Sequence, residues 1–197
     1  MLPLKDNIPT DRPPVVTLAL IAIELVAHFA LHQHGGVLYL AGEILFLWWF
    51  GVSVEDAMSR PRFLAFCLLG GLCAIGLQIA LDAGAEAAAI GASGAIASVL
   101  GGYLVLYPRA RFVSVALVPF AFTLVELPAW VLVGVWLLLQ AAFAATSHPL
   151  GGGSAVAFLA QAGGLAFGLL AVRAFAQRRK QPPPPSSARG RAEAALP

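Results

Sequence analysis

Long apolar stretches dominate this chain and recur from residue 15 to residue 176. A helix needs about 20 mostly apolar residues to cross the hydrocarbon core of a bilayer. The 197 residues are 59% apolar and only 11% charged, too few charges to cover the surface of a soluble domain of this size. We therefore expect an integral membrane protein in contact with the lipid bilayer. The candidate spans are 15–33, 37–54, 63–81, 91–107, 124–146 and 155–176.

The basic residues give these spans an orientation. With six spans, all twelve Lys and Arg residues fall on one side of the membrane. The connections on the other side, 34–36, 82–90 and 147–154, contain no basic residue. Basic residues favour the cytoplasmic side, so this pattern predicts a multi-pass protein of the cell (plasma) membrane with both termini in the cytoplasm. A net charge of +2 is too small to indicate a nucleic-acid partner.

Three parts follow from this arrangement. Residues 1–14 are predicted to form a cytoplasmic N-terminal segment, residues 15–176 an all-α bundle of six transmembrane helices, and residues 177–197 a disordered, Pro-rich basic tail. Pro119 and Pro128 interrupt the long apolar run before residue 146. We therefore expect 112–123 to lie at the interface or in a re-entrant turn, with the fifth span following from residue 124.

Polar residues inside a span are costly, about 2.5–3.5 kcal/mol for a central charge, so each one indicates a structural or functional role. They are Glu24, His28, Glu43, Ser93, Ser98, Glu126, Gln140 and Gln161. The fourth and sixth spans also carry small residues at intervals of four, which allow two helix backbones to approach closely. We predict that these two helices pack together, with Ser93 on one and Gln161 on the other.

The segment Gly91-Ala92-Ser93-Gly94 resembles the GxSG motif of bacterial rhomboid intramembrane serine proteases. The first ten residues and the segments 51–62, 125–130 and 160–168 are also similar to that family, in the same order and spacing. The resemblance implies a six-helix rhomboid bundle whose partners are the transmembrane segments of other membrane proteins. It also implies that Ser93 occupies the nucleophile position, with packing glycines at Gly91, Gly94, Gly164 and Gly168.

The chain departs from the family pattern in three places. The sixth-helix histidine, the general base of the family, is replaced by Gln161, and a carboxamide cannot accept the serine proton. Tyr39 and Glu43 stand where the HxxxN motif supplies oxyanion donors, and the connection between the first two spans is short. These losses predict a pseudoprotease that keeps Ser93 but does not cleave. The resemblance to inactive members of the wider superfamily implies that it binds transmembrane segments of client proteins.

Two alternatives remain open from the sequence. One is an active intramembrane serine endopeptidase that uses Ser93 with an unorthodox base, of which His148 is the best placed. The other is a small proton or cation conduit built on Glu24 and Glu43. A metal cluster of external histidines with Asp82 or Glu86 is disfavoured because the ligand spacing is loose, so we expect no metal and no cofactor.

Overall fold

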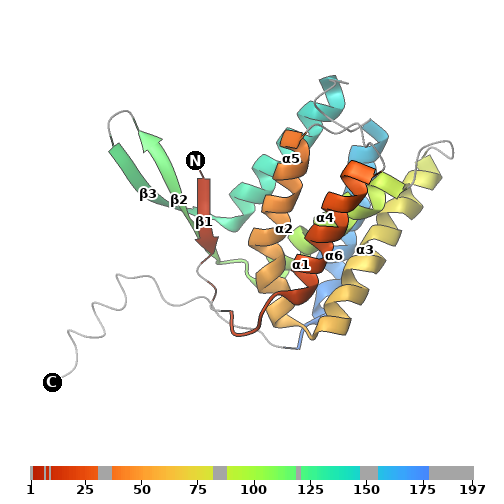
Figure 1. The fold of residues 1–197 in the computed structure, drawn as a ribbon, viewed down its shortest axis with the longest axis horizontal. Coiled ribbons are helices and arrows are strands. Elements are labelled where there is room, and N and C mark those ends of the chain that lie inside the picture. The colour runs from red at the N-terminus through yellow and green to blue at the C-terminus, as the bar shows by residue number, and fades with distance from the viewer. Residues whose placement is uncertain are drawn as a thin grey trace.

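The computed structural model describes residues 2–6, 8, 10–30, 37–81, 88–118, 121–146 and 155–177. In these residues six helices form a bundle, with a small sheet to one side of it (Figure 1). This confirms the all-α, six-helix fold. The helices are α1 (Val15–Ala30), α2 (Val37–Ala57), α3 (Arg60–Leu81), α4 (Ala88–Leu106), α5 (Ala129–Thr146) and α6 (Ala155–Phe175), and the strands are β1 (Leu2–Asp6), β2 (Arg111–Val118) and β3 (Ala121–Pro128).

Proline marks the beginnings of several helices. Pro13 and Pro14 come directly before α1, and the Leu18 amide donates to the Pro14 carbonyl at 3.1 Å. Pro61 lies in the first turn of α3. A proline suits these positions because its fixed φ is helical and the first-turn amides have no partner within the helix. The sequence therefore fixes where these helices begin.

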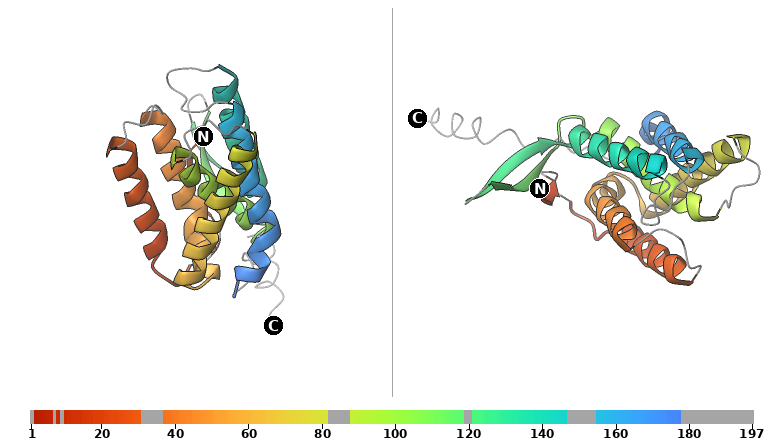
Figure 2. Two further views of the ribbon diagram at one scale, coloured as in Figure 1. Left: turned by 90° about the vertical axis from the view of Figure 1, so that its right-hand side faces the viewer. Right: turned by 90° about the horizontal axis from the view of Figure 1, so that it is seen from above.

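Helix α4 lies at the centre of the bundle. It packs most extensively against α6, next against α3, and also against α2 (Figure 2). This confirms the prediction that the fourth and sixth spans pack together. Helices α4 and α6 run parallel, whereas α3 runs antiparallel to both, as the pairs of residues in contact along them show.

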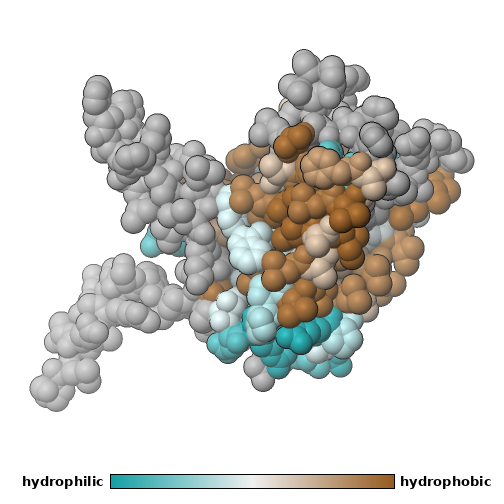
Figure 3. All heavy atoms as spheres, in the orientation of Figure 1, coloured by the Kyte–Doolittle hydropathy of each residue, from teal (hydrophilic) through white to brown (hydrophobic). Residues whose placement is uncertain are grey.

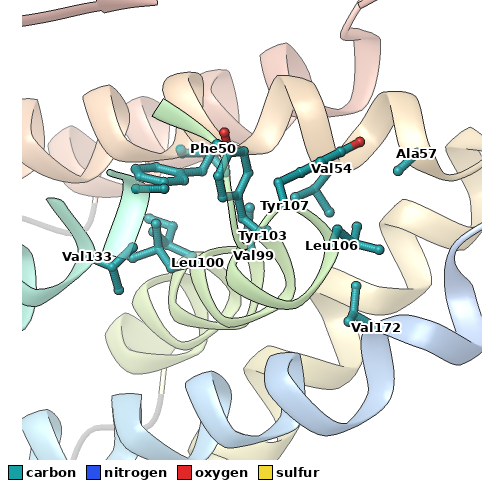
Figure 4. Close-up of a cluster of buried hydrophobic side chains, with 14 of the residues drawn as sticks. Phe50, Val54, Ala57, Val99, Leu100, Tyr103, Leu106, Tyr107, Val133 and Val172 are labelled. Carbon is teal, nitrogen blue, oxygen red and sulfur yellow. The ribbon is translucent and has the colours of Figure 1, made fainter. Parts of the chain in front are cut away.

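The apolar core surrounds the second half of α4. Figure 4 shows Val99 and Tyr103 of α4, and Tyr107 directly after it, between α2 on one side and α6 on the other. The rings of Phe50 and Tyr103 meet edge to face, with their centroids 4.8 Å apart. The Tyr107 hydroxyl donates to the Ser53 carbonyl of α2 at 3.2 Å, so this buried phenol is satisfied. Aromatic packing therefore holds α2 against α4.

The predicted start of the fifth span at residue 124 is wrong. Residues 121–128 form β3, which pairs antiparallel with β2, and α5 begins only at Ala129. An apolar run does not by itself distinguish a strand from a helix, and here the run pairs with the equally apolar β2. The Ala129 amide donates to the Ala110 carbonyl at 3.1 Å and closes the base of the hairpin.

The sheet also includes the N-terminal segment. Strand β1 pairs antiparallel with β2, which gives the order β1-β2-β3. Residues 1–14 were predicted to form a cytoplasmic segment, without a strand. Pairing across more than 100 residues depends on the tertiary arrangement, since β1 precedes all six helices and β2 follows four of them.

The bundle presents an apolar surface. Figure 3 shows a broad hydrophobic area over the helices and a hydrophilic area at the end where α1 begins and α2 meets α3. Leu72 of α3 is 61% exposed and Leu170 of α6 is 84% exposed. By length and composition α3 is, among the described residues, the one helix able to cross a membrane, and four other apolar helical segments are shorter. An exposed apolar face of this kind suits contact with lipid.

Candidate functional site

Ser93 lies in α4, in the part of the helix that packs between α3 and α6. Its side chain is buried, with 5% of its surface exposed. Gly94 follows it directly, and Ser98 lies a little more than one turn further along the helix. The Ser98 hydroxyl donates to the Ala95 carbonyl at 2.7 Å within α4, which leaves this hydroxyl engaged in the helix itself.

Glycines bring α6 into backbone contact with α4. A Cβ atom at Gly164 would overlap the Gly94 carbonyl, and one at Gly168 would overlap the Ser98 carbonyl. A Cβ at Gly101 would likewise overlap the Leu165 carbonyl of α6. Only glycine permits so close an approach of two backbones. This contact fixes α6 beside the segment of α4 that carries Ser93.

Helix α3 packs as closely on another side of α4. A Cβ at Gly94 would overlap the Cβ of Ala74, and one at Gly70 would overlap the Ser98 side chain. The same stretch of α4 therefore contacts both α3 and α6. Ser93 begins this stretch and is held in a rigid, closely packed frame.

Gln161 lies on α6 and is also buried, with 4% of its surface exposed. It stands three residues, about one helical turn, before Gly164, which contacts Gly94. The structure thus places Ser93 and Gln161 on adjacent parallel helices, at neighbouring levels of the bundle. The buried polar group that α6 supplies beside the serine helix is therefore a carboxamide.

Gln78 of α3 is a buried polar residue that is not among the predicted site residues. It is 1% exposed and lies one turn beyond Ala74, which contacts Gly94. Within the part of the chain that the structure describes, neither its amide nitrogen nor its amide oxygen has a hydrogen-bond partner. A glutamine in the middle of the apolar run 63–81 was the signal that could have identified it.

The other two substituted residues, Tyr39 and Glu43, both lie on α2. Glu43 is buried, and its side chain forms a hydrogen bond with the side chain of Glu24 on α1. Tyr39 lies one turn earlier on α2, and its side chain is outside the described residues. The Glu43 carboxyl group therefore has at least one partner that belongs to α1.

The remaining predicted polar residues are distributed over the molecule. Gln140 is buried on α5, and Glu126 of β3 forms an exposed ion pair with Arg111 of β2 at 3.2 Å. The external histidines and acidic residues of the disfavoured metal cluster lie outside the described residues. They are His32, His34, Asp82, Glu86 and His148. Among the described residues, no group of three or more His, Cys, Asp and Glu side chains is arranged to hold a metal ion.

A second polar cluster lies at the end of the bundle where α1 begins. The Glu55 carboxylate accepts hydrogen bonds from the Val16 and Thr17 amides, at 2.9 and 2.7 Å, and from the Thr17 hydroxyl at 2.7 Å. Asp56 accepts from the amides of Asp11 and Arg12. The end of α2 thus binds the start of α1, where amides are free and the helix dipole favours a negative charge.

The geometry defines a class of protein before any comparison is made. Six helices with an apolar surface enclose a buried serine at a glycine-mediated contact between two helices, which is the organisation of a helical membrane protein with a polar interior site. The family profile described as Rhomboid domain matches residues 20–178. The chain therefore belongs to the rhomboid family. The comparisons with curated proteins and with solved structures gave no match.

Proposed function

We propose that the chain is a rhomboid pseudoprotease that binds transmembrane segments of client membrane proteins without cleaving them. The observation that carries this proposal is the buried Gln161, one turn from the contact between Gly164 and Gly94. A serine hydroxyl becomes an effective nucleophile only when a neighbouring base takes its proton. A carboxamide can donate and accept hydrogen bonds but does not take up a proton near neutral pH.

The missing base has a large expected effect. In a serine protease, removal of the base alone lowers turnover on the order of 10⁶-fold. Glu43, at the second substituted position, is engaged with Glu24 of α1. An ionised carboxylate there would repel the oxyanion that forms during acyl transfer. The loss of the base weakens catalysis whatever the protonation of Glu43, and neither substitution removes the bundle that would hold a client helix.

The exposed basic residues support an orientation of the bundle in the membrane. They lie where α3 begins and where α4 and α6 end, and the residues are Arg60, Arg62, Arg109, Arg111 and Arg173. These helix ends belong to one end of the bundle, because α4 and α6 run parallel and α3 runs antiparallel to them. Basic residues collect on the cytoplasmic side. We therefore place this end, both termini and the tail 177–197 in the cytoplasm of a plasma-membrane protein that crosses the bilayer several times.

Fluorophosphonate labelling tests the catalytic part of the proposal. The full chain is reconstituted in lipid vesicles with a single-span model peptide that carries a photo-crosslinker. We expect cross-linking of the intact peptide, with no cleavage and no labelling that depends on Ser93. Labelling or cleavage that disappears in Ser93→Ala would contradict the proposal and favour the active endopeptidase. A cross-linking signal no higher than the background in controls without the peptide would contradict client binding.

Gln161→His refines this result. If the missing base at position 161 is the main reason for the lost activity, the new imidazole restores Ser93-dependent labelling. The matched control is Gln140→His, the same substitution at another buried glutamine on a different helix. We expect no labelling in this control. Labelling in both variants would show that an imidazole acts non-specifically and would remove the special role assigned to Gln161.

A further inference from the structure

The buried face of α1 is polar. Its buried residues are Thr17, Glu24 and His28, at spacings of seven and four that place them on one side of the helix. Several apolar residues of α1 face outwards, with Ile23 63% and Val26 67% exposed. Three others are partly buried and pack against the apolar core, namely Val16, Leu20 and Ile21. Helix α1 therefore meets the bundle through polar groups as well as apolar ones, and its fully buried side chains are the polar ones.

Glu24 and Glu43 form the middle of this polar contact. Both side chains are buried, and the carboxyl groups of Glu24 and Glu43 lie within hydrogen-bonding reach of each other. An ionised carboxylate is only an acceptor, so a hydrogen bond between two carboxyl groups requires a proton on at least one of them. Two adjacent carboxylates without that proton would repel each other strongly in an apolar interior.

Among the residues with described side chains, α1 and α2 carry no lysine or arginine, and the arginines of α3 are exposed. The second oxygen of Glu24, Oε1, is buried and has no hydrogen-bond partner among the described residues. His28 is the one other described titratable side chain on the buried face of α1. Helices α2 and α3 pack against α1 and carry the other titratable or charged residues with described side chains. On α2 these are Glu55 and Asp56, which bind residues at or before the start of α1. On α3 they are the exposed Arg60, Arg62 and Cys73 and the buried Cys67.

We propose that Glu24 and Glu43 form a proton-binding site inside the bundle and hold one exchangeable proton between their carboxyl groups. The site lies between α1 and α2, whereas Ser93 and Gln161 lie on α4 and α6. The proposal therefore does not depend on whether Ser93 is catalytic. Loss of the proton would place two negative charges at the contact and weaken the attachment of α1 to α2.

Infrared spectroscopy of the full chain in phosphatidylcholine vesicles at neutral pH tests this site. A protonated carboxyl group has its own carbonyl band, which shifts in deuterated water. We expect this band in the wild type and in Ser93→Ala, and its loss in the double variant Glu24→Gln/Glu43→Gln. The matched control is Glu126→Gln, which removes an exposed carboxylate and should leave the band unchanged. Absence of the band in the wild type, or its persistence in the double variant, would overturn the proposal.

A second measurement needs no variant and covers the case in which the double variant does not fold. Dicyclohexylcarbodiimide is an apolar reagent that adds to protonated carboxyl groups within membranes. We expect peptide mapping of the treated wild-type protein to locate the adduct at Glu24 or Glu43, and not at Glu55, whose carboxylate accepts hydrogen bonds from amides. A protein modified at neither Glu24 nor Glu43 would contradict the proposed site.

Discussion

The bundle contains two helix contacts that are built in opposite ways. Helices α3, α4 and α6 meet through glycines and other small residues, with backbone against backbone. Helices α1 and α2 meet through carboxyl groups, at Glu55 near one end and at the pair of Glu24 and Glu43 further along. The contact among α3, α4 and α6 requires positions without side chains, whereas the contact between α1 and α2 requires particular polar side chains.

This difference reflects the solvent. Lipid tails are as apolar as leucine side chains, so apolar side chains gain little from moving out of lipid and onto another helix. Two other forces can hold membrane helices together, namely close van der Waals packing and hydrogen bonds. The central contact uses the first, which tolerates little change in volume. The α1–α2 contact uses the second, which depends on protonation and on the exact donor groups.

The largest effect is expected where the backbones of α4 and α6 are in direct contact. In Gly164→Ala the new Cβ overlaps the Gly94 carbonyl, and a backbone atom cannot move aside as a side chain can. We expect a loss of roughly 3 kcal/mol or more in the free energy of unfolding. Thermal unfolding in detergent micelles, followed by circular dichroism, measures it. An unchanged midpoint would show that α4 and α6 are further apart than described.

The matched control for this substitution is Gly76→Ala in α3. A Cβ at Gly76 meets no described atom within 4 Å. Alanine is the better helix former, by up to about 1 kcal/mol, so we expect equal or slightly higher stability. A comparable loss in both variants would mean that helix glycines matter here for a reason other than close contact.

The second effect tests the polar contact. Glu55→Ala removes the acceptor of the partly buried Val16 amide and the buried Thr17 amide and leaves both donors unpaired. We expect a loss of about 2–3 kcal/mol, because bonds to a charged group are strong and the orphaned donors are costly. Protease cleavage in the first 14 residues should increase as the start of α1 detaches. Glu55→Gln keeps one acceptor oxygen and should lose less, so equal losses would argue against the hydrogen-bond account.

The smallest effect concerns a polar residue inside the closely packed region. Gln78 is buried and has no hydrogen-bond partner among the described residues. Gln78→Met has a similar shape and removes the unpaired amide, so we expect a gain of about 1 kcal/mol in stability. The same unfolding measurement checks it. A loss of stability would reveal that the amide has a partner, and the contrast between the two contacts would then be less sharp.

Much of the fold was predictable from local sequence. Apolar runs long enough for a membrane gave the six helices, because each helix satisfies its own backbone hydrogen bonds whatever its neighbours do. The starts of α2 and α6 agree with the predicted spans to the residue. The small residues at intervals of four in the fourth and sixth spans also indicated the contact between α4 and α6.

The strands and several polar contacts were not predictable in this way. Strand β3 reads as the beginning of a helix, and only its pairing with β2 distinguishes the two. Glu55 lies just beyond the predicted second span, and its role appears only when the start of α1 is placed beside it. The roles predicted for Ser93, Gln161, Tyr39 and Glu43 remain predictions, and the experiments above address the first two directly.

The amino-acid sequence alone is sufficient to establish a helical membrane protein of six helices, with Ser93 in the fourth helix and Gln161 in the sixth, and with no imidazole in the sixth. These properties depend on composition and on helical periodicity. The tertiary structure decided which polar groups meet, including Glu24 with Glu43, Glu55 with the start of α1, and the unpaired Gln78 beside the central contact. Such pairings depend on the rotation and depth of each helix in the bundle, and those are set by packing between helices rather than by any one of them.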